Sequence, residues 1–376
     1  MNIVIVAENY PYRVDPAFAF VQQLAFALSN EGEKVTVIAP QSVSKALIRR
    51  TSIKPRKSID VSPEEHKIEV LRPYTLTFSN TRLSILTRIS KALTTLAIRR
   101  GIRKCESIDA LYCYFWHTGL MTGRVSKSIP LFVQASECDI TVMPYMRKEK
   151  YLQKVLGVVC ASSKNKEESI AAGLTVADKC QVIVNGYRKD LFYKIDKSVA
   201  RDQLGIKQDA FIVCFVGGFI ERKGITELSE ALKQLDNVDS IFIGKGNVIP
   251  TCNNIVFQGV VNHNELVKYL NCADIFVLPT KAEGCCNAII EALACGLPVV
   301  SSNKSFNDEI LDETCSIRIN EDSVDEIREA IKYLRDNAVI RSEMSKAALV
   351  KAETLTIERR GKGVADFIKN RMSTIQ

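Results

Sequence analysis

The chain has 376 residues, of which 46% are hydrophobic and 25% are charged, the balance of an ordinary soluble globular protein. This length exceeds what one hydrophobic core usually supports, so we expect two domains, and no apolar run is long enough to cross a membrane. The net charge of +8 fits an anionic substrate or an anionic membrane surface, and it equally fits an ordinary solvated surface.

The chain opens with MNIVIVAENYP, which lacks the length and the basic start of a secretory signal and is typical of a first β-strand. We therefore expect a cytoplasmic protein. Its twelve cysteines are scattered between Cys105 and Cys315 without a C-x-x-C pair, and its three histidines are far apart. Zinc sites need such spacings, so we expect reduced thiols in the core and no bound metal.

In the first half of the chain, short apolar runs typical of strands alternate with amphipathic stretches such as the helical AFAFVQQLAFALSNEG, residues 17–32. The expected strands are NIVIVA (2–7), KVTVIAP (34–40), HKIEVLR (66–72), IDALYCYF (108–115), IPLFVQAS (129–136), VLGVVCAS (155–162) and CQVIVNG (180–186). This alternation indicates a parallel sheet covered by helices on both faces.

One stretch, residues 82–104, has apolar and basic residues at helical spacing on different faces. The apolar positions are Leu83, Leu86, Ile89, Leu93 and Leu96, and the basic ones are Arg88, Lys91 and Arg99. Such a helix can lie on an anionic membrane, which would suit a lipid-linked acceptor. The commoner explanation is a helix that covers the first sheet and keeps its charges in water.

The alternation stops at the polar residues 185–206 and then resumes. The later expected strands are AFIVCFVGG (210–218), DSIFIG (239–244), NIVFQG (254–259), ADIFVLPT (273–280) and GLPVVSS (296–302), and residues 323–376 are typical of charged helices. We therefore expect an α/β protein of two doubly wound, Rossmann-like domains that face each other across a cleft. Ligands of such sheets bind beyond the carboxyl ends of the strands.

Two segments of the second domain carry candidate chemistry. In FIVCFVGGFIERKG a strand ends at Gly217 and Gly218 and is followed by Arg222 and Lys223, a plausible cradle for a diphosphate. A Gly-Gly turn with surface charges explains the same residues, and neither a P-loop nor a G-x-G-x-x-G fingerprint is present.

In FVLPTKAEGCCNAIIEALACG a strand, a turn and a helix place Glu283 at the start of the helix and Glu291 about two turns further on. Glu291 stands among apolar residues, and an unpaired buried carboxylate costs several kcal/mol. Its partner is therefore either a basic residue of the protein or a ligand.

Taken together, these segments resemble the family 4 retaining glycosyltransferases, which have the GT-B fold. The E-x7-E spacing of Glu283 and Glu291 is similar to the family's signature, NGYRKDLF to the N-G-v-D-x-x-x-F segment that opens its second domain, and FVGGFIERKG to its V-G-r-x-x-x-x-K-G phosphate loop. The resemblance covers nearly the whole chain and is strongest over residues 185–302.

The resemblance implies how a nucleotide diphosphate sugar would bind. Glu291 would accept hydrogen bonds from the ribose hydroxyls, so that its partner is a ligand, and Lys223 would hold the diphosphate. Glu283 would contact the donor sugar and stabilise positive charge on its ring. The other implied contacts to the donor are the backbone N–H groups of Gly284, Cys285 and Cys286, and Asn287, which matches the asparagine of the subgroup pattern E-G-x-x-N. The backbone at Gly259 and Val260 would read the base.

This chain departs from the family pattern in the phosphate loop and in the first loop. The family's loop arginine falls on Gly218, and Arg222 is the candidate to replace it. The glycine-rich first loop is replaced by DPAFAF, with Ala17 and Ala19 where small flexible residues are usual.

A third departure concerns the first domain. The H-G-x-D segment appears as SECD, which places Ser136 at the histidine position and retains Asp139. His117, in YFWHTGL, either compensates or is an ordinary histidine near a strand end.

The resemblance implies a retaining hexosyltransferase with an acceptor-binding domain at residues 1–185 and a nucleotide-sugar domain at 186–360, with the last helix, about 360–376, packing back onto the first. The donor would be a UDP- or GDP-sugar and the acceptor a glycan or lipid-linked glycan, without a cofactor or nucleic acid, in the cytoplasm or at the inner face of the cell membrane. No D-x-D triplet occurs, so we expect no obligatory metal. A nucleotide-sugar epimerase and a non-catalytic nucleotide-sugar-binding protein are the alternatives.

Overall fold

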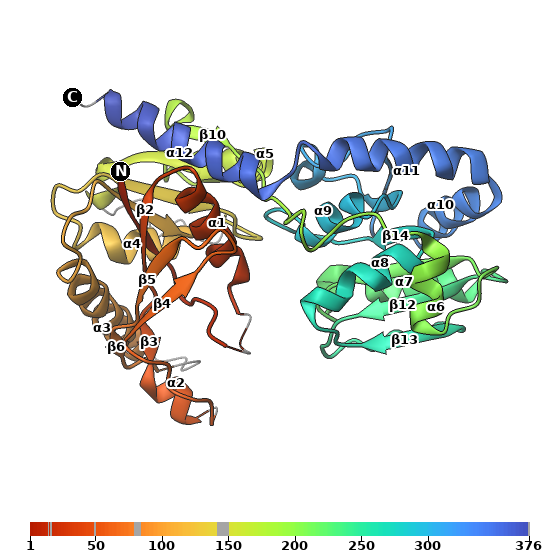
Figure 1. Ribbon diagram of the computed structural model, residues 1–376, viewed down its shortest axis with the longest axis horizontal. Coiled ribbons are helices and arrows are strands. Elements are labelled where there is room, and N and C mark those ends of the chain that lie inside the picture. The colour runs from red at the N-terminus through yellow and green to blue at the C-terminus, as the bar shows by residue number, and fades with distance from the viewer. Residues whose placement is uncertain (14, 16, 49, 79–83, 141–149, 375–376) are drawn as a thin grey trace. The chain divides into compact units, whose positions relative to one another are not determined.

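The structure is a computed structural model that describes residues 1–376 except 14, 16, 49, 79–83, 141–149 and 375–376 (Figure 1). The chain folds into two compact units. The N-terminal unit contains residues 1–183 and the C-terminal helix, residues 357–376; the second unit contains residues 184–356. The roles expected for the two domains, acceptor binding and nucleotide-sugar binding, stay predictions.

The N-terminal unit is built on an eight-stranded sheet. Its strands, in spatial order, are β10 (Cys180–Val182), β9 (Val155–Cys160), β8 (Leu131–Ala135), β7 (Ala110–Tyr114), β1 (Asn2–Val6), β2 (Lys34–Ile38), β5 (Lys67–Leu71) and β4 (Lys57–Val61). All neighbours are parallel except β4 and β5, which are antiparallel. The seven parallel strands are the seven apolar runs that the sequence indicates.

The edge strand β4 is not predicted by the sequence pattern. In KSIDV, exposed and half-buried positions alternate, so the strand contains no continuous apolar run. An antiparallel edge strand needs only one packed face, which explains this composition. A small separate sheet pairs β3 (Gln41–Ser42) with β6 (Tyr74–Thr75).

Helices cover both faces of this sheet. They are α1 (Ala19–Asn30), α2 (Val43–Ile48), α3 (Ser84–Ile102), α4 (Trp116–Gly123), α5 (Ser163–Ala171) and α12 (Ile357–Ser373). Successive residues of β1 point to opposite faces, as strand geometry requires: Ile3 and Ile5 pack in the core that includes residues of α1 and α12, whereas Val4 and Val6 pack with residues of α3 and α4.

The helix expected at residues 82–104 is α3, and Leu83 lies outside the described residues. Its two halves differ. In the C-terminal half, Ala97 and Ile98 are buried, and a Cβ at Gly101 would lie 2.8 Å from Ile38, so this half covers the sheet. In the N-terminal half, Ile85 and Ile89 are exposed.

The C-terminal helix α12 belongs to the N-terminal unit, where it contacts α1 and β9. Gly361 permits a close approach, because a Cβ there would lie 2.6 Å from that of Ala27. Further along, the ring of Phe367 meets that of Phe132 edge-on, with centroids 6.1 Å apart. These contacts hold the end of the chain on the first sheet.

The second unit is built on a six-stranded parallel sheet. Its strands, in spatial order, are β13 (Ile255–Gly259), β12 (Asp239–Ile243), β11 (Ile212–Val216), β14 (Ile275–Leu278), β15 (Val299–Ser302) and β16 (Ser316–Ile319). Its helices are α6 (Lys197–Leu204), α7 (Ile225–Lys233), α8 (Leu266–Cys272), α9 (Asn287–Ala294), α10 (Val324–Asp336) and α11 (Ala338–Ala352). All five strands expected in this part of the chain are present, and β16 is an additional edge strand.

The cysteines behave as core residues. All twelve are free thiols, and eight of them are buried. Among the described helices, none combines the length and the apolar character that crossing a membrane requires.

Candidate functional site

Two loops meet at the carboxyl edge of the second sheet, the one after β11 and the one after β14. The backbone N–H of Lys281 donates to the carbonyl oxygen of Arg222 over 2.8 Å. Gly224 has φ +71°, and a Cβ there would lie 2.1 Å from the carbonyl oxygen of Pro279. Only glycine combines this conformation with so close a contact. The sequence-predicted phosphate loop is thereby held against the turn that carries Glu283.

Glu283 is buried and lies at the centre of a charged cluster formed by these loops. Its Oε1 accepts from Arg222 Nη1 at 2.9 Å, from Lys223 Nζ at 2.5 Å and from Thr280 Oγ1 at 3.0 Å. Arg222 also donates to the carbonyl oxygen of Ala282. Two cations and one carboxylate leave this cluster with a net charge of +1, so it can attract an anion. We call Arg222, Lys223 and Glu283 the Glu283 cluster.

Lys223 is charged at neutral pH. Burial acts to lower its pKa, but Cys286 and the ion pair with Glu283 outweigh burial and raise the pKa above its ordinary value. Burial raises the pKa of the Cys286 thiol to about 12, so this neighbour is a neutral thiol at pH 7. The stem of Lys223 lies along Gly217, where a Cβ would be 3.6 Å from Cδ and Cε.

Gly218, where the family pattern has arginine, faces open space: no atom lies within 4 Å of the position of its Cβ. The loop itself is well fixed. Gly217 N–H donates to the carbonyl oxygen of Ile243, and a Cβ on Gly244 would lie 1.8 Å from the carbonyl oxygen of Gly217. The exit of β11 is therefore locked to that of β12, while the space in front of Gly218 is open.

Helix α9 starts beside the Glu283 cluster. Gly284, Cys285 and Cys286 lead into it, and the side chain of Cys286, at the cap position, makes no capping hydrogen bond. Asn287 is exposed and accepts from Asn185 Nδ2 at 2.7 Å. The helix start thus offers N–H groups and a positive dipole end close to Lys223 and Glu283.

Glu291 has a partner within the protein. Its Oε1 lies 3.1 Å from His263 Nε2, and its side chain is 14% exposed. The inference that this acid lacks an internal partner, and so needs a ligand, is therefore wrong: sequence reasoning looked for a lysine or arginine and missed a histidine 28 residues away. Its expected role toward a ribose stays a prediction.

The hydrogen bond to Glu291 raises the pKa of His263 above its ordinary value, against the effect of burial. The His263 ring is also packed edge-on against Phe192, with centroids 5.1 Å apart. Within the described part of the chain, the second carboxylate oxygen of Glu291 has no hydrogen-bond partner. His263 and Phe192 thus hold Glu291 in one orientation with one acceptor oxygen to spare. Val260, at the end of β13, is well exposed.

The SECD segment follows β8 in the N-terminal unit. Ser136 is half-buried and Asp139 is exposed. Two residues of α5 hold the segment in place: Lys164 Nζ donates to the carbonyl oxygen of Cys138 at 2.7 Å, and Asn165 Nδ2 donates to that of Glu137 at 2.8 Å.

Sequence reasoning missed Glu137 in this segment. Its two carboxylate oxygens accept the backbone N–H groups of Trp116 at 2.6 Å and Ser136 at 2.9 Å, so it joins the end of β8 to the start of α4. Burial raises its pKa to about 7, against the effect of these hydrogen bonds, and the charge of Glu168 adds to the rise. The signal that could have found it is an acidic residue directly after a fully buried strand.

His117 is the second residue of α4 and is half-buried. Burial lowers its pKa, the charge of Glu8 acts in the opposite direction, and that of Lys91 adds to the lowering. His117 is therefore neutral at pH 7. It lies within electrostatic range of Glu8, which follows β1, and of Lys91 on α3. Whether it substitutes for the family's histidine stays a prediction.

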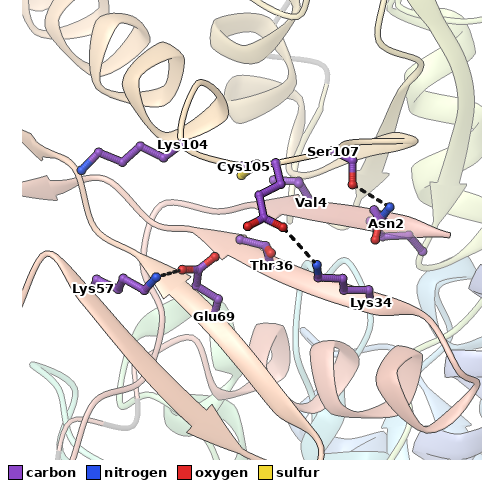
Figure 2. Close-up of a pocket in the computed structure, with 11 residues that line it drawn as sticks. Asn2, Val4, Lys34, Thr36, Lys57, Glu69, Lys104, Cys105 and Ser107 are labelled. Atoms are coloured by element: carbon purple, nitrogen blue, oxygen red, sulfur yellow. Dashed lines mark hydrogen bonds and ion pairs between the residues drawn. The ribbon is translucent and has the colours of Figure 1, made fainter.

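A pocket of about 200 Å³ opens at the amino ends of β1 and β2 (Figure 2). Lys57 pairs with Glu69 there, and Lys34 Nζ lies 3.8 Å from Glu106. This edge of the sheet is opposite to the one that carries Ser136 and Glu137. The pocket contains none of the predicted site residues, and these lysines already have acidic partners.

Comparisons with known proteins relate the second unit to a family of enzymes. Residues 196–350 match the model of the family described as "Glycosyl transferases group 1". A candidate teichuronic acid biosynthesis glycosyltransferase, TuaC of Bacillus subtilis (strain 168), is 28% identical over 370 residues, which cover 92% of each chain. Over residues 196–350 the chain matches the group 1 glycosyltransferases. The match spans the unit that holds the Glu283 cluster and Glu291.

Two further similarities extend this result. The UDP-Gal:alpha-D-GlcNAc-diphosphoundecaprenol alpha-1,3-galactosyltransferase of Escherichia coli is 28% identical over 268 residues, 63% of this chain and 69% of that protein. The sucrose-phosphate synthase structure from Thermosynechococcus elongatus superposes with a TM-score of 0.79 over 99% of both chains, at 18% identity. The chain therefore has the GT-B type of fold, with two Rossmann-like units.

Proposed function

We propose that this glycosyltransferase moves a hexose from a UDP- or GDP-sugar to an acceptor hydroxyl, with retention at the anomeric carbon and without a metal ion. The observation that carries the proposal is the Glu283 cluster: Arg222 and Lys223 converge on one oxygen of Glu283 beside the start of α9. The absence of a D-x-D triplet from the sequence supports a metal-independent reaction.

The two cations act on the leaving diphosphate. Breaking the bond between sugar and phosphate builds negative charge on the phosphate oxygens, and donors placed in advance around that charge lower the barrier. A diphosphate competes with Glu283 for Lys223 and Arg222, and the latter is already one-third exposed. Once the cations turn to the phosphates, Glu283 becomes available to face the donor sugar and to stabilise positive charge on its ring.

Glu291 binds the ribose in this proposal. His263 occupies one of its oxygens and fixes the carboxylate, which leaves the other oxygen for the ribose hydroxyls. The exposed Asn287 and Val260, the N–H groups of Gly284, Cys285 and Cys286, and the open space before Gly218 complete the donor site.

The proposed stereochemical course rests on the family resemblance, and one carboxylate at the sugar is compatible with it. A retaining glycosidase places two carboxylates about 5 Å apart across the sugar. Here Glu291 is committed to the ribose, so Glu283 stands alone at the sugar. The double displacement of a glycosidase is thus disfavoured, and the resemblance implies that the acceptor attacks from the face that the phosphate leaves, with the departing phosphate taking the proton of the acceptor hydroxyl.

The acceptor is a glycan or a lipid-linked glycan in the synthesis of a cell-surface polysaccharide or glycolipid, and transfer takes place in the cytoplasm, at the inner face of the membrane. The names of the relatives support this part of the proposal: one is assigned to teichuronic acid synthesis, and another transfers galactose to a sugar on diphosphoundecaprenol. Ser136, Asp139 and Glu137, at the carboxyl edge of the first sheet, are the candidate acceptor contacts.

A thermal-shift screen against UDP- and GDP-sugars tests the donor, because only the true donor and close analogues stabilise the protein strongly. The best donor is then incubated with a panel of acceptors, and the anomeric configuration of the product is read by NMR. We expect a retained linkage in buffer with EDTA. An inverted product, or activity that EDTA abolishes, would refute those parts of the proposal.

The same experiment separates the alternatives. An altered nucleotide sugar formed from the donor alone would indicate an epimerase. Donor binding without turnover across the acceptor panel would indicate a non-catalytic binding protein. Glu283→Gln should abolish transfer with the fold intact, whereas Glu227→Gln, at an acid that pairs with Lys281 outside the cluster, should not.

A further inference from the structure

An apolar surface is exposed on the N-terminal unit, where α2, the residues around β6 and the first half of α3 lie together. Leu47 and Ile48, at the end of α2, are 68% and 76% exposed. We call this surface the α2–α3 face; its other exposed members are Leu76, Phe78, Ile85 and Ile89. Water-facing side chains of this size are expected where a second surface covers them.

The segments that form the face are held together by specific bonds. Ser44 Oγ donates to the carbonyl oxygen of Thr77 at 2.6 Å, which joins α2 to the residues after β6. The N–H of Phe78 donates to Ser90 Oγ on α3 at 2.8 Å. Figure 1 shows α2, β3, β6 and α3 gathered at one end of the N-terminal unit, and α2 and α3 both contact β6. The apolar side chains therefore form one surface rather than separate protrusions.

Basic residues accompany the α2–α3 face. Residues 43–57 and 73–104, the stretches of sequence from which it comes, contain 13 lysines and arginines and no aspartate or glutamate. The whole chain has a net charge of +8, so everything outside these two segments has a net charge of −5. Lys45, Arg50, Arg88 and Lys91 lie in the described segments that form the face, whereas Lys57 and Lys104 line the pocket at the opposite edge of the sheet.

We propose that the α2–α3 face docks on an anionic phospholipid membrane. Exposed apolar side chains with lysine and arginine in the same segments, and no acidic residue there, match the acyl boundary and the negative headgroups of such a surface. Two copies of the chain would bring two strongly basic faces together, and like charges oppose that pairing. The two interpretations of α3 thus apply to different halves of the helix: the second half covers the sheet and the first half meets the membrane.

The position of the face narrows the class of acceptor. α2 follows the carboxyl end of β2, and β6 follows that of β5, so both lie at the edge of the sheet where β8 leads into Ser136 and Glu137. A lipid-linked acceptor in the docked membrane would present its sugar at this same edge. Docking is independent of catalysis, whereas the assignment of a lipid-linked acceptor rests on the proposed function.

Sedimentation with vesicles tests the docking. The full chain is mixed with phosphatidylglycerol–phosphatidylcholine vesicles and with pure phosphatidylcholine vesicles at low and high salt. We expect binding to the anionic vesicles only, weakened by salt. Leu47→Ser with Ile48→Ser should lower partitioning about tenfold. The matched control is Val339→Ser with Val350→Ser on α11, where the two valines are 72% and 71% exposed; it should bind like the unaltered chain.

Three results would overturn the docking proposal: no binding to anionic vesicles, equal loss in the control, or concentration-dependent dimerisation through this face without vesicle binding. Far-UV circular dichroism checks that both double variants are folded. Transfer to a water-soluble acceptor should be unchanged in the Leu47/Ile48 variant. Loss of transfer by all forms would overturn the proposed function and leave the docking proposal standing.

Discussion

Glu137 should make the stability of the N-terminal unit depend on pH. Its folded-state pKa of about 7 lies above the ordinary value of 4.5, so between these values the folded chain holds a proton that the unfolded chain has lost. The free energy of unfolding should therefore fall as the pH rises from 4.5 through 7, and the full loss is present above pH 7. At about 1.4 kcal/mol per pH unit, the difference corresponds to about 3 kcal/mol.

Solvent reduces this magnitude, because the Glu137 side chain is only half-buried, and we expect about 1–2 kcal/mol. Trp116 is the only tryptophan of the chain, is fully buried, and donates its backbone N–H to Glu137. Its fluorescence during urea unfolding therefore reports on this unit. As the pH rises from 5 to 8, the free energy of unfolding of the unaltered chain should fall relative to that of Glu137→Gln. The control Glu358→Gln, at an exposed acid of α12, should follow the unaltered chain.

Parallel pH profiles for the unaltered chain and Glu137→Gln would show that this carboxyl is not perturbed. A loss of stability of the unaltered chain, relative to Glu137→Gln, that grows as the pH falls would show that the pKa of Glu137 is lowered and not raised. Either result would refute the description of Glu137 as an acid whose pKa is raised between β8 and α4.

Two further predictions concern the second unit. Gly224→Ala should lower the free energy of unfolding by at least about 2 kcal/mol in urea, because the added methyl group meets Pro279 and φ is +71°. Gly205→Ala, at φ +66° with no atom within 4 Å, should lower it by only about 1 kcal/mol. Equal losses in the two variants would contradict the close contact at Gly224. Glu291→Gln should lower the pKa of His263 in an NMR titration and leave those of the other two histidines unchanged, and an unshifted His263 would show that the ion pair does not form in solution.

Buried parallel strands could be predicted because both of their faces are apolar, which leaves a continuous hydrophobic run in the sequence. The strand β4 could not, since an edge strand that packs one face shows only a short alternation. Helix ends follow local chemistry: α9 ends at Ala294, and Gly296, two residues on, takes the left-handed conformation (φ +73°) that commonly follows a helix. Local composition thus predicted most elements of both units.

The site was predicted less completely, because its contacts join residues far apart in the chain. The loop with Arg222 and Lys223 and the turn with Glu283 were each found from sequence, but not that all three meet at one carboxylate oxygen. The pair of Glu291 with His263 depends on where α9 and the residues after β13 lie in the fold. Spacing along the chain does not encode such a contact.

The position of Lys223 explains why a mutation there should act on chemistry rather than on folding. Its ammonium group approaches the cluster from the side of Gly217, and its removal leaves Glu283 with Arg222 and Thr280 as donors. The carboxylate is thus not left unpaired. Lys281, two residues before Glu283 in the chain, is the matched control. It pairs with Glu227 at 2.8 Å and with Asp322 at 2.6 Å, outside the cluster.

The most direct test of the donor site is therefore the rate of sugar transfer by Lys223→Ala compared with Lys281→Ala, measured under saturating donor. Removing one preorganised donor to developing negative charge lowers kcat by about 10²–10³-fold. We expect a loss of that size in Lys223→Ala and a nearly unchanged rate in Lys281→Ala, with both proteins folded. Transfer by Lys223→Ala at the rate of the unaltered chain would contradict the assignment of the Glu283 cluster to the leaving diphosphate.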